Sequence, residues 1–196
     1  ACHSEFARNA PNYEDMYLKP LAGWVAGTHL DDVACTSPRV VLGPTGEFSA
    51  DLAVVMDVDL PPARFAQVDI VNPFKPGDGD AICFADAGFS AEACRVNGEA
   101  ANLADYLTTH DADIRLPLVA DYCGAAINVS IKHIDAVARR VEFYAPVFPG
   151  LTYRVAAPVG CDPVGAGDDA PVGTAATFAC NCILNFIYDG LEGKPA

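Results

Sequence analysis

The sequence predicts an α+β fold built on a mainly antiparallel sheet, with a central helix and a C-terminal helix. Three observations support this fold class. Short apolar runs with alternating polar residues follow one another along the chain, as they do in half-buried strands. Helical spacing of apolar residues occurs chiefly at residues 99–110 and 183–191. Since few of the strand-like runs alternate with helices, antiparallel pairing is favoured over a doubly wound parallel sheet.

The N-terminal part of the chain is expected to hold a short extension and then strands. Residues 1–20 form the extension, with a short polar helix near residues 12–18. Residues 39–42 indicate a strand that leads into a tight turn at residues 43–46. In residues 48–60 apolar and polar side chains alternate in part, which predicts a half-buried strand.

The remainder of the chain is richer in strand signals. Asn97-Gly98 is a typical hairpin turn, and a helix is expected from residue 99 to about residue 110, with apolar residues on one face. A C-terminal helix follows over residues 183–191. The predicted strands of this part are residues 81–85, 91–96, 116–120, 126–134, 140–145, 151–156 and 174–182. Residues 126–134 and 140–145 give the clearest hairpin pattern.

Length and composition point to one soluble domain over residues 1–196. A chain of 196 residues of which 52% are hydrophobic can bury a substantial core. Its apolar runs are much shorter than the roughly 20 residues of a membrane helix, and the start lacks a signal-peptide pattern. The net charge is −14, from 26 acidic and 12 basic residues. Such a surface repels a phosphate backbone, so neither nucleic acid nor membrane is an expected partner.

The cysteines allow two interpretations. Eight cysteines would suit the disulfide framework of a secreted protein. Most of them, however, lie in apolar strand-like segments, where free cysteine acts as a small buried hydrophobe. We therefore expect mostly reduced thiols and a cytoplasmic protein whose Ala1 follows a removed initiator Met. Two or more disulfides are the alternative. The eight are Cys2, Cys35, Cys83, Cys94, Cys123, Cys161, Cys180 and Cys182.

The most suggestive local cluster is Cys180-Asn181-Cys182, followed by Asn185. If the strand persists to Cys182, both sulfur atoms lie on one face. A strand that feeds a helix is a common place for a reactive thiol or an anion site. The simpler interpretation is that two small hydrophobes fill the core below the final helix. Because the four histidines are far apart and in no metal-binding spacing, we expect no metal and no cofactor.

A second candidate cluster lies near the middle of the chain. Asp121 and Tyr122 end one predicted strand, and Asn128 projects from the next. Together they could line a pocket for a polar small molecule. Alternatively, Asp121 caps a turn and Asn128 faces solvent, because turns favour both residue types. The sequence has no nucleophile elbow, P-loop or dinucleotide-binding turn, so it offers no complete set of catalytic residues.

Several segments resemble a bacterial family related to the FIST sensory domains. Residues 21–28 (Leu-Ala-Gly-Trp-Val-Ala-Gly-Thr, with Trp24) are similar to a Gly-x-Trp-Ile-Gly-Gly-Thr segment near the start of that family. The resemblance is strongest at residues 180–188, Cys-Asn-Cys-Ile-Leu-Asn-Phe-Ile-Tyr, and at Leu191-Glu-Gly-Lys. The other segments are residues 116–122, 127–130 and 143–153. The family continues into Gly-Pro-Ile-Thr-Phe-Gly-Glu-Ile where this sequence ends at Ala196, so we expect either a clipped or shortened member or a final strand that comes from elsewhere.

The resemblance implies a non-enzymatic domain that binds a small molecule, such as an amino acid, in signal transduction. The ligand site would combine Trp24, Asp121, Tyr122, Asn128, Cys180, Asn181, Cys182 and Asn185. Two alternatives remain open. One is a cysteine- or metal-dependent enzyme centred on Cys180 and Cys182. The other is a self-assembling structural protein in which an open sheet edge pairs with a second copy, and a homo-oligomer is expected only under this alternative.

Overall fold

A computed structural model of the chain describes residues 5, 9, 12, 19–28, 37–68, 72–122, 124–159, 178, 180 and 182–188, and of residues 185–187 only the backbone. The structure divides into two units, Ala1–Asp69 and Ile70–Ala196. Each unit is described by itself. The helix expected at residues 12–18 lies outside the described residues, apart from Asn12.

The first unit contains a small hairpin. Strand β1 (Val40–Leu42) pairs antiparallel with β2 (Glu47–Ser49), and Gly46 in the connecting turn has a φ of +69°. The strand and the turn expected here are confirmed. The half-buried strand expected over residues 48–60 is wrong, because β2 ends at Ser49 and residues 52–60 are exposed. The alternation is present in the sequence, but no neighbouring strand of the described structure pairs with it.

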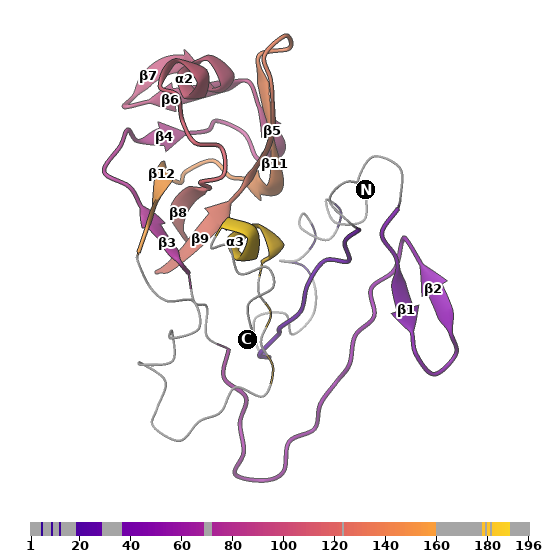
Figure 1. The fold of residues 1–196 in the computed structure, drawn as a ribbon. Coiled ribbons are helices and arrows are strands. Elements are labelled where there is room, and N and C mark those ends of the chain that lie inside the picture. Colours follow the sequence, from indigo (N-terminus) through magenta and orange to yellow (C-terminus); the bar gives the residue numbers. More distant parts are fainter. Residues whose placement is uncertain are drawn as a thin grey trace. The chain divides into compact units, whose positions relative to one another are not determined.

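The second unit is built from ten described strands and two short helices (Figure 1). The strands are β3 (Phe74–Pro76), β4 (Ile82–Cys83), β5 (Gly88–Ala91), β6 (Ala93–Val96), β7 (Glu99–Asn102), β8 (Leu118–Tyr122), β9 (Ala125–Val129), β10 (Ile131–Asp135), β11 (Arg140–Val147) and β12 (Tyr153–Pro158). The helices are α2 (Leu103–Thr109) and α3 (Ile183–Tyr188).

Two antiparallel sheets organise these strands. The larger sheet has the order β7-β6-β4-β12-β8-β9, and β3 pairs with β12 beside this path. The smaller sheet has the order β10-β11-β5. Strand β12 pairs with three neighbours, β3, β4 and β8. It therefore holds together segments that lie up to about eighty residues apart in the sequence.

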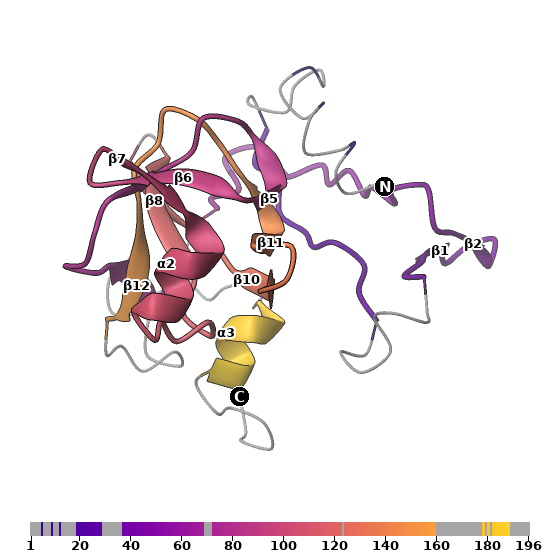
Figure 2. The same ribbon diagram turned by 90° about the horizontal axis from the view of Figure 1, so that it is seen from above.

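The core lies between these sheets and helix α2 (Figure 2). Helix α2 buries Leu103, Ala104 and Leu107. They meet side chains from both sheets, so removing the helix would expose the core to water. The other buried members of this core are Ile82, Phe84, Cys94, Leu118, Ala120, Val129, Ile131, Val141, Phe143, Val147 and Tyr153.

The central helix begins later than the sequence predicts. Asn97 and Gly98 both adopt positive φ, 50° and 88°, as the favoured two-residue hairpin turns require. This turn returns residues 99–102 along β6, so they form β7. Asn102 then starts the helix by accepting a hydrogen bond from the backbone N–H of Asp105 at 3.1 Å. Pairing across the turn thus overrides the weak helical pattern of residues 99–102.

The predicted hairpin of residues 126–134 and 140–145 is divided between the two sheets. Residues 125–129 form β9, which pairs with β8. After Ser130 the chain continues as β10, which pairs with β11. The turn between Asp135 and Arg140 places Arg139 at a φ of 52°. The chain therefore leaves the larger sheet at Ser130 and enters the smaller one.

These features make the fold mostly β, so the predicted α+β class with a central and a C-terminal helix is wrong. The described helices of the second unit, α2 and α3, have seven and six residues, and strands dominate the rest of that unit. The strand expected at residues 174–182 is absent at the described residues Phe178, Cys180 and Cys182; its other residues lie outside the described part. Short apolar runs suit buried helix and buried strand alike, which explains the error.

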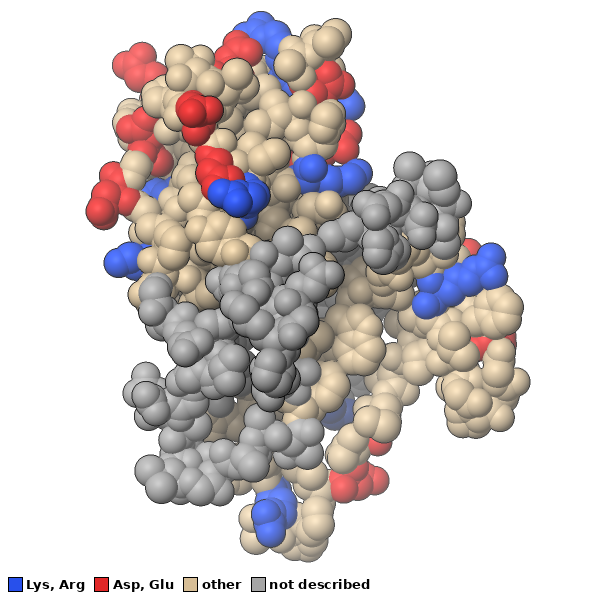
Figure 3. Space-filling view, in the orientation of Figure 1, with Lys and Arg blue, Asp and Glu red and all other residues tan. Residues whose placement is uncertain are grey.

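Charged side chains of both signs are interspersed on the second unit, as the view in Figure 3 shows around α2 and the strands beside it. Arg139 pairs with Asp105, and Lys132 pairs with Glu142 at 3.2 Å. None of the described helices has the length and apolar character that crossing a membrane requires.

Tyr153 on β12 joins the core to the adjoining loop. Its ring is fully buried and stacks edge-on against Phe84, with 5.3 Å between the ring centroids. Its hydroxyl accepts a hydrogen bond from the backbone N–H of Phe148 at 2.9 Å. The same hydroxyl lies 2.9 Å from that of Tyr122. One buried oxygen therefore satisfies two polar groups on neighbouring segments.

We expect Tyr153→Phe to destabilise the fold by about 1–3 kcal/mol, because the Phe148 N–H and the Tyr122 hydroxyl lose a partner that water replaces poorly. Urea unfolding followed by circular dichroism measures this change. Tyr144→Phe is the matched control, since the Tyr144 ring is exposed. Equal stabilities for the two variants would contradict the role given to the Tyr153 hydroxyl.

Candidate functional site

Two asparagine side chains meet on the surface of the larger sheet. Asn72 precedes β3 and Asn128 lies on β9, and each amide donates to the oxygen of the other, at 2.8 and 2.9 Å. Asn72 also donates to the carbonyl of Ala126 at 2.9 Å and accepts from the N–H of Phe74 at 3.0 Å. These bonds use the full capacity of the Asn72 amide, whereas Asn128 keeps one N–H and one lone pair for other partners.

Strand register places Asp121 on the same face as Asn128. Residues directly opposite in an antiparallel pair share a face, and Val119 lies opposite Asn128 while Asp121 lies opposite Ala126. These four residues form one patch, which we call the β8–β9 face. Asp121 is exposed, and its Oδ1 accepts a hydrogen bond from the N–H of Gly124 at 2.5 Å. Asp121 therefore caps a turn and still offers its second oxygen to solvent.

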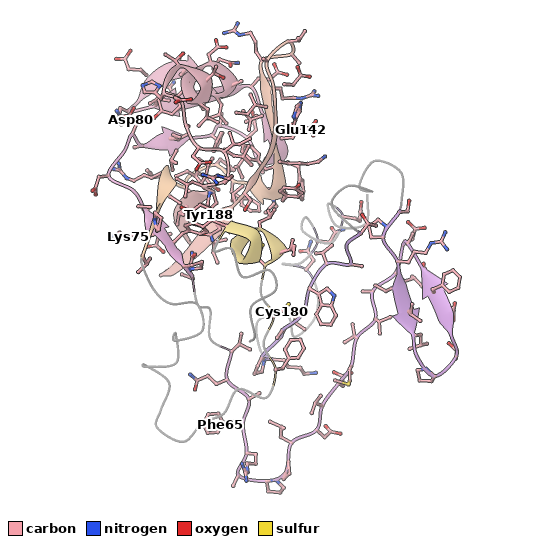
Figure 4. The ribbon with its side chains drawn as sticks, viewed as in Figure 1. Phe65, Lys75, Asp80, Glu142, Cys180 and Tyr188 are labelled. Atoms are coloured by element: carbon pink, nitrogen blue, oxygen red, sulfur yellow. The ribbon has the colours of Figure 1, made fainter. Side chains whose placement is uncertain are left out.

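The C-terminal helix packs on this same face. Tyr188 of α3 belongs to a small apolar cluster with Phe74, Val119 and Ala126. Its ring meets that of Phe74 edge-on, at 5.1 Å between centroids, and Figure 4 shows Tyr188 between the helix and the strands. Although residues 121–128 and 183–188 are far apart in sequence, the fold brings α3 next to the patch that carries Asp121 and Asn128.

Positive charge adjoins the patch through Arg115. Its guanidinium lies 6.0 Å from the centre of the Tyr188 ring, an attractive cation–π geometry. Two of its nitrogens also donate to both carboxylate oxygens of Asp113, at 2.6–3.1 Å. This contact lowers the pKa of Asp113 to about 2. The surroundings of the β8–β9 face therefore combine a carboxylate, a guanidinium, an amide and an aromatic ring.

Tyr122 does not join this site. As the next residue after Asp121 on β8, its side chain points to the opposite face. There its hydroxyl meets that of Tyr153, and its ring contacts Phe148 edge-on at 6.1 Å. Burial, together with the Tyr153 hydroxyl, raises the pKa of Tyr122 well above its usual value. The expected pocket that combines Tyr122 with Asp121 and Asn128 is therefore divided between two faces of the sheet.

For the other residues expected at the site the structure gives only their exposure or their place in the chain. Trp24 is exposed and belongs to the first unit. Cys180 and Cys182 are exposed and form no disulfide. They therefore do not fill the core below the final helix, which is the simpler interpretation of their spacing. Asn181 lies outside the described residues, and Asn185 is described only by its place in α3. Whether these residues bind a ligand stays a prediction.

The described cysteines are all free thiols. Cys83 and Cys94 lie in the second unit, on β4 and β6. Burial, and then the neighbouring Cys83, raise the pKa of Cys94, which makes that thiol a poor nucleophile at neutral pH. Cys2, Cys35, Cys123 and Cys161 lie outside the described residues. Across the described part of the chain, no three His, Cys, Asp or Glu side chains are grouped as metal ligands.

A second polar cluster was not foreseen from the sequence. The Asp80 carboxylate accepts one hydrogen bond from the Asn97 amide at 2.7 Å and another from the Tyr106 hydroxyl at 3.0 Å. The His110 ring stacks on Tyr106 with 4.4 Å between centroids, and Arg154 donates to the carbonyl of the neighbouring Gly79. Only the Asn97-Gly98 turn signal hinted at this cluster, because its members come from separate elements.

These partners stabilise the Asp80 carboxylate. The hydrogen bond from Asn97, then that from Tyr106, and to a smaller degree the charges of His110 and Arg154 lower the pKa of Asp80 below its usual 3.8. Asn97 also bonds to Ala81, the residue before β4: its Oδ1 accepts from the Ala81 N–H, and its own backbone N–H donates to the Ala81 carbonyl. The cluster therefore fastens β4 to β6. We therefore interpret it as structural.

The molecule is thus a mostly β domain whose best candidate site is the β8–β9 face beside α3. Over residues 1–196 the chain matches the model of DUF6976, a family of unknown function, and it belongs to that family. No curated protein and no solved structure matches the chain. The resemblance to FIST domains is not tested by these comparisons and stays a prediction.

Tyr106→Phe is expected to raise the pKa of Asp80 toward 3.8, because one of its two side-chain hydrogen bonds is lost. Since folding lowers this pKa, the parent gains stability above the unfolded-state value and loses it as the pH falls through the folded-state value. The variant should therefore lose less stability over that acidic range. Carboxyl NMR titration of the folded protein measures the pKa directly.

The Asp135 carboxyl provides the control within the same spectra. Its pKa is lowered chiefly by the N–H groups of Ala138 and Val137, and Tyr106→Phe leaves these untouched. An unchanged pKa for Asp80 in the variant, or an equal shift at Asp135, would show that the Tyr106 hydroxyl does not stabilise the Asp80 carboxylate.

Proposed function

We propose that this chain is a non-enzymatic binding domain for a small polar molecule, of the sensory kind that the FIST resemblance implies. The β8–β9 face is the binding surface. One observation carries the proposal: Asp121 and Asn128, which the sequence predicts as ligand contacts, share one face of the sheet. Helix α3, which lies within the segment most similar to FIST domains, packs on this same face through Tyr188.

The chemistry of this face favours a ligand with both an amine and a carboxylate. The free oxygen of Asp121 attracts a cationic amine. Asn128 has one unused N–H, and the Arg115 guanidinium beside Tyr188, although paired with Asp113, keeps further N–H groups to donate. The Asn128 N–H and the Arg115 guanidinium can each donate a hydrogen bond to an anionic or carbonyl oxygen of the ligand. The Tyr188 ring offers apolar surface to a short side chain of the ligand. Amino acids carry this combination of groups.

The cellular compartment is part of the same proposal. We place the protein in the cytoplasm, where reduced thiols persist, and the four described free cysteines are consistent with such surroundings. Thiol titration of the unfolded protein, purified without reductant and with oxygen excluded, tests this assignment. Eight titratable thiols are expected, and blocked pairs would indicate an exported, oxidised protein instead.

Asp121→Asn should weaken amino-acid binding at least tenfold, about 1.4 kcal/mol. The substitution removes the charge but keeps an oxygen for the Gly124 N–H, so the turn is preserved. Binding is detected by thermal-shift screening against the common amino acids and small carboxylates, and located by chemical-shift changes at residues of β8, β9 and α3.

Asp135→Asn is the matched control. Asp135 also caps a turn, accepting the N–H groups of Val137 and Ala138 at 3.0 and 2.8 Å, but it lies at the end of β10. It should leave affinity unchanged. The proposal fails if none of the compounds binds, or if Asp121→Asn and Asp135→Asn weaken binding equally.

A further inference from the structure

The described part of the first unit exposes an extended apolar segment that pairs with no described strand. Residues 52–60 follow the β1–β2 hairpin as a long irregular run (Figure 1). Their large apolar side chains are between 45% and 81% exposed. Within the described structure these nine residues form no backbone hydrogen bond, and none has a positive φ. An extended chain with free N–H and carbonyl groups can pair with another strand.

The side-chain pattern of this segment is a palindrome. Every second residue from 52 to 60 is apolar, and the order Leu-Val-Met-Val-Leu reads the same in both directions around Met56. Side chains at alternate positions of a strand share one face. The segment therefore has one apolar face with a mirror-like centre, in the sequence Leu52, Val54, Met56, Val58 and Leu60.

We propose that residues 52–60 pair antiparallel with the same segment of a second copy of this chain, around a two-fold axis at Met56. In this register Leu52 lies opposite Leu60, Val54 opposite Val58, and Met56 opposite Met56 of the second copy. Self-complementary patches of this kind are what a two-fold symmetric dimer requires. Exposed apolar surface is removed from water on both copies.

The charges on the other face support this register. Asp57 lies opposite Val55 of the second copy, and Asp59 lies opposite Ala53, so no carboxylate directly faces another. A parallel, in-register pairing would place Asp57 against Asp57 and Asp59 against Asp59, and directly opposed like charges destabilise a strand pair. The palindrome and the charge placement therefore select the same antiparallel arrangement.

The flanking residues limit the length of the pairing. Pro61 and Pro62 follow Leu60 and lack the N–H donors that a strand pair needs.

At the other end of the segment, residues 52–55 and the β1–β2 hairpin line an apolar groove of about 260 Å³. Leu60 of the second copy would lie beside this groove. Nine paired residues from each copy bury a small area compared with the roughly 1,200–2,000 Å² of a stable interface. We therefore infer a reversible, concentration-dependent dimer.

Met56→Asp tests the apolar face. Sedimentation of the full chain over a wide concentration range should show a monomer–dimer equilibrium for the parent and at least a tenfold weaker one for Met56→Asp. Because Met56 is exposed, the variant should retain the far-ultraviolet circular dichroism of the parent. Val137→Asp is the control: it adds the same charge at a valine that is 97% exposed in the β10–β11 turn, and it should dimerise like the parent.

Cysteine cross-linking tests the register. Directly opposite residues of an antiparallel pair have Cα atoms about 4.5–5.5 Å apart, within reach of a disulfide. Met56→Cys should therefore cross-link to itself under mild oxidation, whereas Ala53→Cys, whose opposite residue is Asp59, should not. Peptide mass spectrometry identifies the linked positions, and the parent gives the background from its own exposed thiols, Cys180 and Cys182.

Several results would overturn the inference. A parent that stays monomeric at every concentration would do so, as would a dimer that Met56→Asp leaves unchanged. Self-cross-linking of Ala53→Cys as fast as that of Met56→Cys would replace the antiparallel register by a parallel one. Slow amide exchange of residues 52–60 in a strict monomer would mean that the segment pairs within its own chain.

Discussion

The register of β12 is the constraint on which the second unit depends. This strand pairs with β3, β4 and β8 at once, so its alternation assigns side chains to two different surroundings. Tyr153 and Val155 point toward the main core, while Ala156 joins the cluster below α3. A slip by one residue would exchange these faces. The buried Tyr153 hydroxyl, held by Phe148 and Tyr122, opposes such a slip because its bonds exist in one register only.

The same alternation along β8 separates side chains of the core from those of the proposed binding face. Val119 and Asp121 face α3, whereas Ala120 and Tyr122 face the core. Tyr122 is committed to the interior, where its hydroxyl has a partner and its pKa is raised. Asp121 is exposed one residue earlier. The Asn72–Asn128 pair fixes β3 to β9, and it leaves Asn128 with hydrogen-bonding capacity at the surface. The candidate site is therefore strand backbone that carries a few polar atoms with spare hydrogen-bonding capacity.

The sequence predicts local features of this fold better than its long-range pairing. The Asn97-Gly98 turn was found because two consecutive positive φ values need these residue types. Residues 99–102 were assigned to a helix because their pattern suits either state, and only pairing with β6 decides it. The sequence identifies Asp121 and Asn128 as polar residues on strands, but it also groups Tyr122 with them, although adjacent residues of a strand face opposite sides. The Asp80 cluster was missed, since Asn97, Tyr106 and His110 meet only through the tertiary fold.

The segment of residues 52–60 illustrates what alternation means physically. The sequence predicted a half-buried strand there, and the described structure gives an exposed chain. An alternation of apolar and polar residues indicates that one face of the strand is more stable when it is removed from water. It does not indicate which surface covers that face. A palindromic order narrows the choice, because the segment is complementary to its own reverse. The net charge of −14 on each copy makes two copies repel each other at distances within the screening length. The repulsion increases with each added copy, so it opposes assemblies larger than a dimer. Apolar self-complementarity combined with this repulsion gives a dimer that forms and dissociates with concentration, in place of an open-ended assembly.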